Sequence, residues 1–242
     1  MPHSEKVFLI AEWRDLLLLN YEIDPALLRG LVPEGTELDS FQGKRYVSLV
    51  GFRFCRTKYL GRIPVLFHSE FEEINLRFYV RRQAVGEIRR GVVFIAEIVP
   101  KLAIAKTARW VYGENYICRQ MEHRQMNDGR GRTVGYGWKG PTGWCRLQAR
   151  VEGRPALAPE GTVQQFITEH YWGYSRQKSG RSFEYQVSHE PWRAWAATQA
   201  SFDGDPTDLY GQELAKVLGR RPDSAFLAEG SAVSVFQAAA IA

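Results

Sequence analysis

The sequence lacks any long run of apolar residues. Its longest unbroken aliphatic stretch covers residues 16–19, and the apolar stretch at 92–99 is interrupted by Glu97. A membrane-spanning helix needs about 20 consecutive, mostly apolar residues, so none is predicted. The first six residues are polar and lead directly into an alternating segment, without the apolar region and cleavage site of a signal peptide. We therefore expect a cytoplasmic protein.

Cysteine is scarce and has no recognisable spacing. Cys55, Cys118 and Cys145 are an odd number of widely separated residues, which argues against a disulfide framework and against a paired-cysteine metal site. The sequence also has no HxH or HExxH spacing, no glycine-rich loop leading into a predicted helix, and no Gly-x-Ser-x-Gly motif. We therefore expect reduced thiols, no metal, no cofactor and no hydrolase activity.

An excess of one charge is also missing. The 32 basic and 27 acidic residues leave a formal charge of +5, largely from arginine. The arginine pairs at 81–82 and 89–90 could meet phosphate, but they are short and interleaved with acidic residues. No basic helix, zinc-finger spacing or RNP-like motif accompanies them. Solvated strand ends are the preferred interpretation, and no nucleic-acid partner is predicted.

Aromatic residues are abundant, with seven Trp, eleven Tyr and thirteen Phe, and they suit half-buried sheet faces and pocket walls. Alternation of apolar and polar residues recurs along the chain and predicts about ten strands. So many strands favour one mainly β (α+β) domain over residues 1–242, either a barrel or a sandwich. The predicted strands cover residues 13–23, 46–57, 72–80, 91–98, 116–126, 133–138, 144–151, 182–188, 192–201 and 225–236.

Helices are predicted to be few and short. Asp24-Pro25 is an N-cap followed by proline at the first helical position, and it predicts a helix over 26–31. Pro100 opens a second helix in the same way, with Lys101 on its packed stripe. Two further helices are predicted from 162 to about 171 and over 206–218.

Several motifs carry a resemblance to a known family. Residues 17–39 (LLLNYEIDPALLRGLVPEGTELD) resemble the opening of acetoacetate decarboxylase-like proteins, and nearly the whole chain is similar to the YqjF-like family, the uncharacterised domain of unknown function 2071 of that superfamily. The resemblance implies a closed, largely antiparallel β-barrel with a central cavity and a few short peripheral helices. Further matching segments are INLRFYV (74–80), EIVPK (97–101), ENY (114–116), EHYWGY (169–174) and HEPW (189–192).

The resemblance also implies candidate chemistry. In decarboxylases of the superfamily, a lysine directly after a proline forms a Schiff base with a β-keto acid, and Lys101 matches that position. An arginine near the substrate carboxylate matches Arg14. The second lysine, which lowers the pKa of the first, is replaced by Leu102, and the glutamate before the Ile-Pro-Val segment has no counterpart. The fold is therefore expected, whereas the reaction stays open.

Two groups allow alternative interpretations. Burial and the positive end of a helix dipole favour a reactive Lys101, whereas exposure of its amine, or an ion pair with Glu97, would make it inert; the inert state is preferred. His170, on the inner stripe of its helix, and His189, at a strand end, could act as acid and base or could be satisfied core residues. The structural role is preferred for both histidines.

Our leading hypothesis is that the barrel interior binds a small anionic organic molecule. The alternation at 72–80 puts polar side chains on one face, and the resemblance favours that face as the cavity wall. The alternatives are a Schiff-base lyase or decarboxylase acting on a keto acid through Lys101, and a non-catalytic structural or regulatory protein. A homo-oligomer is expected if the apolar outer face is covered by a partner. The candidate ligand-binding residues are Arg14, Asn75, Arg77, Tyr79, Glu97, His170 and Tyr174, with Lys101 as the candidate catalytic residue.

Overall fold

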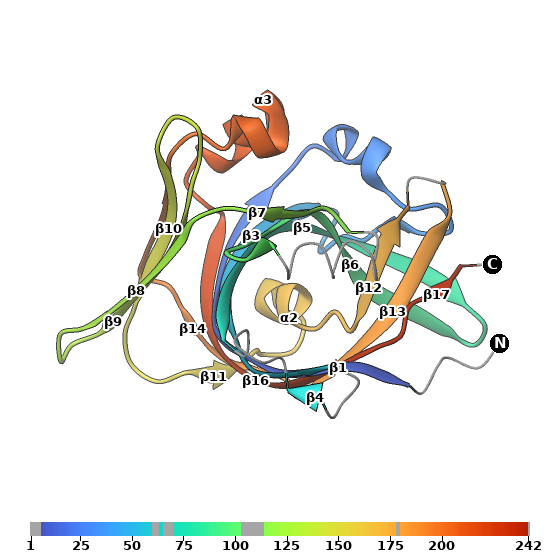
Figure 1. Ribbon diagram of the computed structural model, residues 1–242, viewed down its shortest axis with the longest axis horizontal. Coiled ribbons are helices and arrows are strands. Elements are labelled where there is room, and N and C mark those ends of the chain that lie inside the picture. The colour runs from blue at the N-terminus through green and yellow to red at the C-terminus, as the bar shows by residue number, and fades with distance from the viewer. Residues whose placement is uncertain (1–5, 60–62, 65–69, 103–113, 178–179, 242) are drawn as a thin grey trace.

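The computed structural model describes residues 6–59, 63–64, 70–102, 114–177 and 180–241, and its central feature is a closed barrel of seven strands (Figure 1). Around the barrel the strands follow the order β16, β1, β3, β5, β6, β12 and β13, and β13 pairs with β16 to close the ring. Their bounds are β1 Val7–Glu22, β3 Tyr46–Tyr59, β5 Phe71–Ala84, β6 Glu87–Val99, β12 Trp172–Arg176, β13 Ser182–His189 and β16 Ser224–Phe236.

The barrel is mixed, so the expectation of a largely antiparallel one is only partly right. Six of its seven neighbouring pairs are antiparallel, but β12 runs parallel to β6, with Trp172 opposite Gly91 and Gly173 opposite Val92. The sequence did not predict β12 because the helix was extended to about residue 171. Four of the five residues of β12 are buried, so the strand lacks the polar and apolar alternation that reveals a half-exposed strand.

Two predicted strands are each split in two. The segment 116–126 forms β7 (Tyr116–Cys118), which runs parallel to β6, and β8 (Met121–Asn127), which joins a second sheet. The segment 192–201 likewise forms β14 (Arg193–Ala196) in the barrel sheet and β15 (Gln199–Asp203) in the second sheet. The short strands of the barrel sheet are β2 Glu37–Leu38, β4 Ile63–Pro64, β11 Ala156–Leu157 and β17 Ala239–Ala240.

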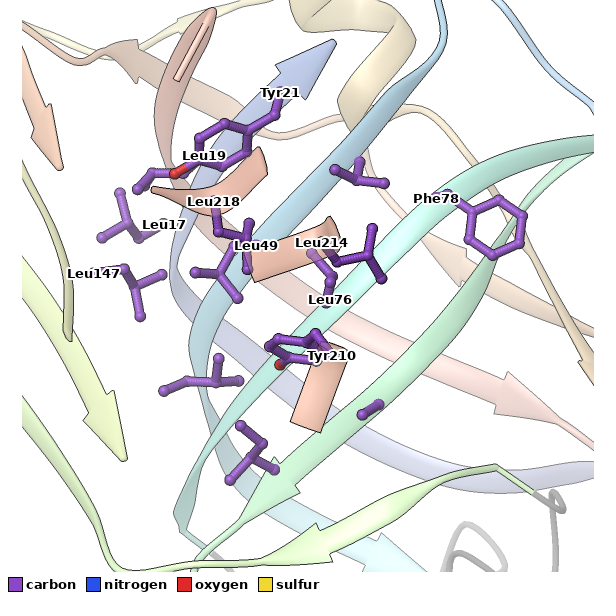
Figure 2. Packing of buried hydrophobic residues seen from close by; sticks show 14 of the residues in the cluster. Leu17, Leu19, Tyr21, Leu49, Leu76, Phe78, Leu147, Tyr210, Leu214 and Leu218 are labelled. Atoms are coloured by element: carbon purple, nitrogen blue, oxygen red, sulfur yellow. The ribbon is translucent and has the colours of Figure 1, made fainter. Parts of the chain in front are cut away.

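The second sheet covers the outside of the barrel. It has the antiparallel order β15, β10, β9 and β8, with β9 over Arg132–Lys139 and β10 over Trp144–Val151. An apolar core fills the space between the second sheet and the barrel, and it contains Leu49 and Leu76 from the barrel wall. Helix α3 (Thr207–Leu218) adds Leu214 and Leu218 to this core (Figure 2). Burial of each such side chain stabilises the fold by about 1.5–3 kcal/mol. The apolar outer face of this part of the wall is therefore covered by the chain itself.

The helices only partly match their predictions. The segment 26–31 forms two 3-10 turns, η1 (Pro25–Leu27) and η2 (Arg29–Leu31), and Asp24 caps the first by accepting a 2.8 Å hydrogen bond from the Ala26 amide. The helix predicted after Pro100 lies almost entirely outside the described residues. Among the residues that are described, no helix has the length and apolar character required to cross a membrane.

Helix α2 (Val163–Thr168) is not peripheral, which corrects the expectation for the helices. It lies within the ring of barrel strands in Figure 1, and the ring of Phe166 lies 5.2 Å from that of Tyr79 and 6.3 Å from that of Tyr46. Phe166 and Ile167 belong to the same buried cluster as residues of the barrel interior. The helix packs inside because its buried face supplies the apolar surface that the interior needs.

Candidate functional site

The barrel encloses a cavity of about 240 Å³. Its walls are mainly apolar and aromatic, and a few polar side chains interrupt them. A cavity of this size and composition suits a small organic molecule, because typical ligand sites combine apolar walls with a small number of polar groups. The aromatic side chains in the lining are Phe8, Trp13, Phe52, Phe54, Phe71, Phe94, Tyr116, Trp172, Tyr185 and Trp192.

Strand β5 presents its polar face to the cavity. Glu73, Asn75 and Arg77 all line the cavity, whereas Ile74 and Leu76, which alternate with them, belong to the core between the barrel and the second sheet. The alternation predicted from the sequence therefore separates an inner polar face from an outer apolar face. The structure places the predicted residues Asn75 and Arg77 on one cavity wall.

Three buried glutamates gather at the cavity. Glu73 is on β5, Glu97 lies opposite Asn75 on β6, and Glu114 precedes β7. Asn75 Nδ2 donates a 3.1 Å hydrogen bond to Glu73 Oε1, and the Tyr185 hydroxyl donates a 2.6 Å bond to Glu114 Oε1. All three carboxyl groups line the cavity, and the exposed fraction of each residue is 8% or less. They form the most concentrated group of ionisable side chains in this wall.

Burial keeps these carboxyl groups protonated at unusually high pH. It raises the pKa of Glu73 to about 8 and that of Glu114 to about 7. Burial, followed by the charges of Glu114 and Glu73, raises the pKa of Glu97 well above its usual range. The neutral carboxyl group of Glu97 donates a hydrogen bond to the Glu114 carboxylate. At neutral pH the cluster therefore carries far less negative charge than three free glutamates.

Arg77 is the charged residue of the opposite sign in this cavity. Its exposed fraction is 8%, its Nη2 donates a 3.2 Å hydrogen bond to the Ile167 carbonyl, and its guanidinium lies 5.7 Å from the centre of the Tyr79 ring. Nε of Arg77 has no acceptor, and the side chain forms no ion pair, within the part of the chain that is described. A buried guanidinium with an unused donor is a natural anchor for an anion.

His170 and His189 also line the cavity. His170 Nε2 lies 3.4 Å from Asp39 Oδ2, and the same oxygen forms an ion pair with Arg90, whose Nε lies 3.1 Å away. Burial lowers the pKa of His170, although Asp39 acts in the opposite direction. His189 stacks on Trp192 at 4.1 Å, and burial lowers its pKa to about 4. Both imidazoles are therefore neutral at pH 7.

The other candidate residues lie elsewhere. Arg14 faces outward, where Nη2 makes a 2.8 Å ion pair with Glu12, and its side chain is 41% exposed. Its neighbour Trp13 lines the cavity, so alternation along β1 directs Arg14 to the opposite face. Asp15 then adopts a φ of 57° and breaks the alternation, which brings Leu16 back to the cavity. The predicted ligand contact Arg14 therefore does not line this cavity.

Three further candidates are outside the cavity lining as the described residues define it. The Tyr174 hydroxyl donates a 3.3 Å hydrogen bond to the Arg89 carbonyl, and its ring belongs to the outer core. The Tyr79 hydroxyl shares a 2.6 Å hydrogen bond with Ser48, and its ring lies 4.8 Å from that of His170. Lys101 is half-buried and follows β6 by two residues.

Sequence reasoning missed Glu73, Glu114 and Tyr185. Glu73 was visible only as one member of the polar face of its strand, and Glu114 only as part of the ENY motif. The sequence suggests Glu97 as an ion-pair partner for Lys101, whereas the groups that determine the pKa of Glu97, apart from burial, are Glu114, Glu73 and Tyr116. The interruption of the apolar stretch 92–99 by Glu97 was the available signal, because an acid there must be buried with the strand. No group of three or more described His, Cys, Asp or Glu side chains is arranged to hold a metal ion.

The closed mixed barrel with a helix inside it and polar groups facing its cavity defines a protein of the acetoacetate decarboxylase-like fold. The chain belongs to DUF2071, a family of uncharacterized conserved proteins, whose model matches residues 10–232. It is also similar to the uncharacterized protein YqjF of Bacillus subtilis, with 25% identity over 207 residues that cover 84% of this chain and 81% of YqjF.

Solved structures share the fold at low sequence identity. Acetoacetate decarboxylase from Legionella pneumophila has a TM-score of 0.66 and 12% identity, covering 100% of this chain and 90% of its own. The enduracididine biosynthesis enzyme MppR, in complex with pyruvate, has a TM-score of 0.70 and 11% identity, with coverages of 100% and 92%. An acetoacetate decarboxylase-like enzyme from Sphingomonas wittichii has a TM-score of 0.65 and 14% identity, with coverages of 96% and 92%. These likenesses establish the fold.

Proposed function

We propose that the barrel interior binds a small organic anion, with Arg77 as the anchor for its carboxylate. The observation that carries this proposal is the buried guanidinium whose Nε has no acceptor among the described residues, in a cavity of about 240 Å³. Of the neighbouring carboxyl groups, Glu73 and Glu97 are mostly neutral at pH 7, because burial raises the pKa of Glu73 to about 8 and that of Glu97 well above its usual range, whereas Glu114, with a pKa of about 7, carries part of a negative charge. The open cavity favours binding over a purely structural role.

The structural neighbours support the choice of ligand class. MppR has been solved in complex with pyruvate, a small carboxylate with a ketone, and acetoacetate decarboxylases share the fold of this chain. Pyruvate and acetoacetate are therefore the first ligands to test. Their size suits a cavity that is smaller than a typical drug-binding pocket of about 300–1,000 Å³.

The test is a binding measurement on two matched arginine variants. Isothermal titration calorimetry with pyruvate and with acetoacetate at pH 7 is expected to show binding to the unaltered protein. Arg77→Met is expected to weaken it by about tenfold or more, because a charged hydrogen bond is worth about 1.5–3 kcal/mol. Arg14→Met removes an arginine that faces outward and should leave binding unchanged. Equal affinity in the Arg77→Met and Arg14→Met proteins would reject the proposal.

A second candidate is chemistry on a bound keto acid through Lys101. It is favoured by the shared fold and by the position of this lysine, two residues beyond Val99, whose side chain belongs to the interior cluster. The lysine amine would attack the keto carbon and water would leave, giving an imine that borohydride reduces to a stable secondary amine. The protein is incubated with acetoacetate or pyruvate and then reduced with borohydride. Peptide mass spectrometry is expected to find the adduct on Lys101. Its absence with both acids would reject this candidate.

A further inference from the structure

The part of the cavity beside the glutamates contains buried polar oxygen atoms without a hydrogen-bond partner among the described residues. Asn75 Oδ1 has no donor among the described residues, although Asn75 is only 2% exposed. Glu97 Oε2, on the facing residue of β6, likewise has no hydrogen-bond partner among the described residues. Asn75 and Glu97 both line the cavity. A buried acceptor without a donor destabilises the protein, so a ligand that carries N–H groups would be favoured here.

The same wall holds the complementary group. Arg77 lies two residues from Asn75 on the same face of β5, and this spacing is about 6.6–6.8 Å along a strand. Its Nε is a buried donor without an acceptor in the described structure, whereas Asn75 Oδ1 is a buried acceptor without a donor. One short molecule with a carboxylate at one end and an N–H donor at the other would satisfy both atoms.

We propose that the cavity binds a small zwitterion, an amino acid or a close derivative, whose carboxylate meets Arg77 and whose ammonium group meets Asn75, Glu97 and their glutamate neighbours. This inference rests on the proposed function, because it takes the anchoring of a carboxylate by Arg77 as given. The aromatic walls suit the hydrocarbon part of such a ligand, and the faces of aromatic rings attract cations such as its ammonium group. By losing a proton, the three acids of this wall can supply the negative charge that an ammonium group requires and that a purely anionic ligand would not need.

Proton release is the distinguishing property of this mode of binding. An ammonium group beside Glu97 favours the ionised carboxylate, so a proton leaves the cluster for solvent when the ligand binds. The ionisable groups around Glu97 are Glu73 on β5, Glu114 and Tyr116 at β7, and Tyr185 on β13. Arg77, His170 and His189 line the same cavity, and both histidines stay neutral above pH 7. Affinity for the zwitterion is therefore expected to increase from pH 6.5 to pH 8.5.

The experiment compares amino acids with the carboxylates that lack only the amine. Calorimetry at pH 8 would use glycine against acetate, β-alanine against propionate, and γ-aminobutyrate against butyrate, in two buffers of different ionisation enthalpy. We expect at least one amino acid to bind about tenfold more tightly than its partner, with net proton release. Glu97→Gln and Glu114→Gln should each reduce that preference, whereas Glu160→Gln, on the exposed surface, should not. Circular dichroism of each variant checks its folding.

Each other outcome rejects a defined part of the proposal. Carboxylates that bind through Arg77 as tightly as the matching amino acids would overturn the zwitterion inference and leave the proposed function standing. A preference for the amino acid that survives in both folded glutamine variants would also overturn the inference, because the glutamates would then not hold the amine. If the amino acids, the matching carboxylates, pyruvate and acetoacetate all fail to bind at millimolar concentration, both the inference and the proposed function are rejected.

Discussion

The hydroxyl of Tyr185 donates a 2.6 Å hydrogen bond to Oε1 of Glu114, across 71 positions of the sequence. Because the bond stabilises the charged form of this carboxyl group, it opposes the effect of burial on its pKa. Glu97, in its neutral form, donates a second hydrogen bond to the same group. Glu114 has a pKa of about 7 and Glu73 one of about 8, so Glu114 holds the negative charge first as the pH rises.

Replacement of Tyr185 by phenylalanine is expected to raise the pKa of Glu114 above about 7, because the variant keeps the burial and loses the hydroxyl donor. Carbon-13 NMR titration of the glutamate carboxyl resonances would measure the change. Tyr210→Phe is the matched control, since the Tyr210 hydroxyl is buried in the outer core and has no partner among the described residues. An unchanged Glu114 titration in Tyr185→Phe would show that the hydroxyl does not determine its charge.

The buried glutamates are expected to make the fold less stable as the pH rises above 7. Their carboxyl groups are protonated in the folded protein and ionised in the unfolded chain, whose glutamates have a pKa near 4.5. Their stabilising contribution is complete below that value and is lost as the pH passes through the folded-state pKa. Each group protonated only in the folded state lowers the free energy of unfolding by about 1.4 kcal/mol per pH unit. Glu73, with a pKa of about 8, should therefore contribute a loss of about 1 kcal/mol between pH 7 and pH 8, because it is half ionised at the upper end of this interval.

Urea denaturation from pH 7 to pH 8.5 would test this slope. This pH range avoids the titration of the two cavity histidines. Their pKa values are lowered, so they change the stability at more acidic pH, where they make the fold more stable as the pH rises. Glu97→Gln keeps the shape of the side chain, removes one titrating group and relieves its neighbours of a like charge, so its stability should depend less on pH. If the slopes of the two proteins agree, the cluster does not govern the alkaline behaviour of the fold.

Removal of the Arg77 charge is expected to raise the pKa of both cavity histidines. The positive guanidinium disfavours the protonated imidazole, and it contributes to the lowered pKa of His170 and of His189. Proton NMR titration of Arg77→Met would report both imidazoles, and Arg77→Lys should restore much of the effect because it keeps the charge. An unaltered titration of both residues in Arg77→Met would place the guanidinium away from them.

The strands that could be predicted well are those with one polar and one apolar face. The predicted strand 144–151 coincides with β10, and the predicted segment 72–80 lies within β5. Strand β12 was missed because its residues are buried on both sides, where alternation disappears. Helix α2 was predicted at nearly the right place, but only tertiary contacts of Phe166 determine that it packs inside the barrel.

The candidate site could be predicted only in part, for a related reason. Asn75 and Arg77 share a strand face, so their proximity follows from a local repeat of two residues. Glu97 and Glu114 meet because β7 returns beside β6 in parallel, and Tyr185 reaches them from β13. Such pairings depend on which strands become neighbours in the closed barrel. Alternation along β1 turns Arg14 away from the cavity that Trp13 lines, and the φ of 57° at Asp15, which returns Leu16 to the cavity, is not visible in the sequence.

The absence of a side chain at Gly173 creates the space that Tyr185 occupies. Gly173 on β12 lies opposite Tyr185 on β13, and a Cβ at this position would overlap Cζ, Cε2 and the hydroxyl of the tyrosine. Gly173→Ala is therefore expected to displace the ring and to lower the free energy of unfolding by about 1–3 kcal/mol, the usual cost of overpacking.

The same substitution should raise the pKa of Glu114, because a displaced Tyr185 hydroxyl no longer donates to it. Thermal unfolding and the glutamate NMR titration measure the two effects. Gly30→Ala is the matched control, since a Cβ at Gly30 meets no atom within 4 Å. Combined with Tyr185→Phe, the alanine should add little further change to the Glu114 pKa, because both substitutions remove the same hydrogen bond. Additive changes in that pKa would show that Gly173 acts on the carboxyl group by another route.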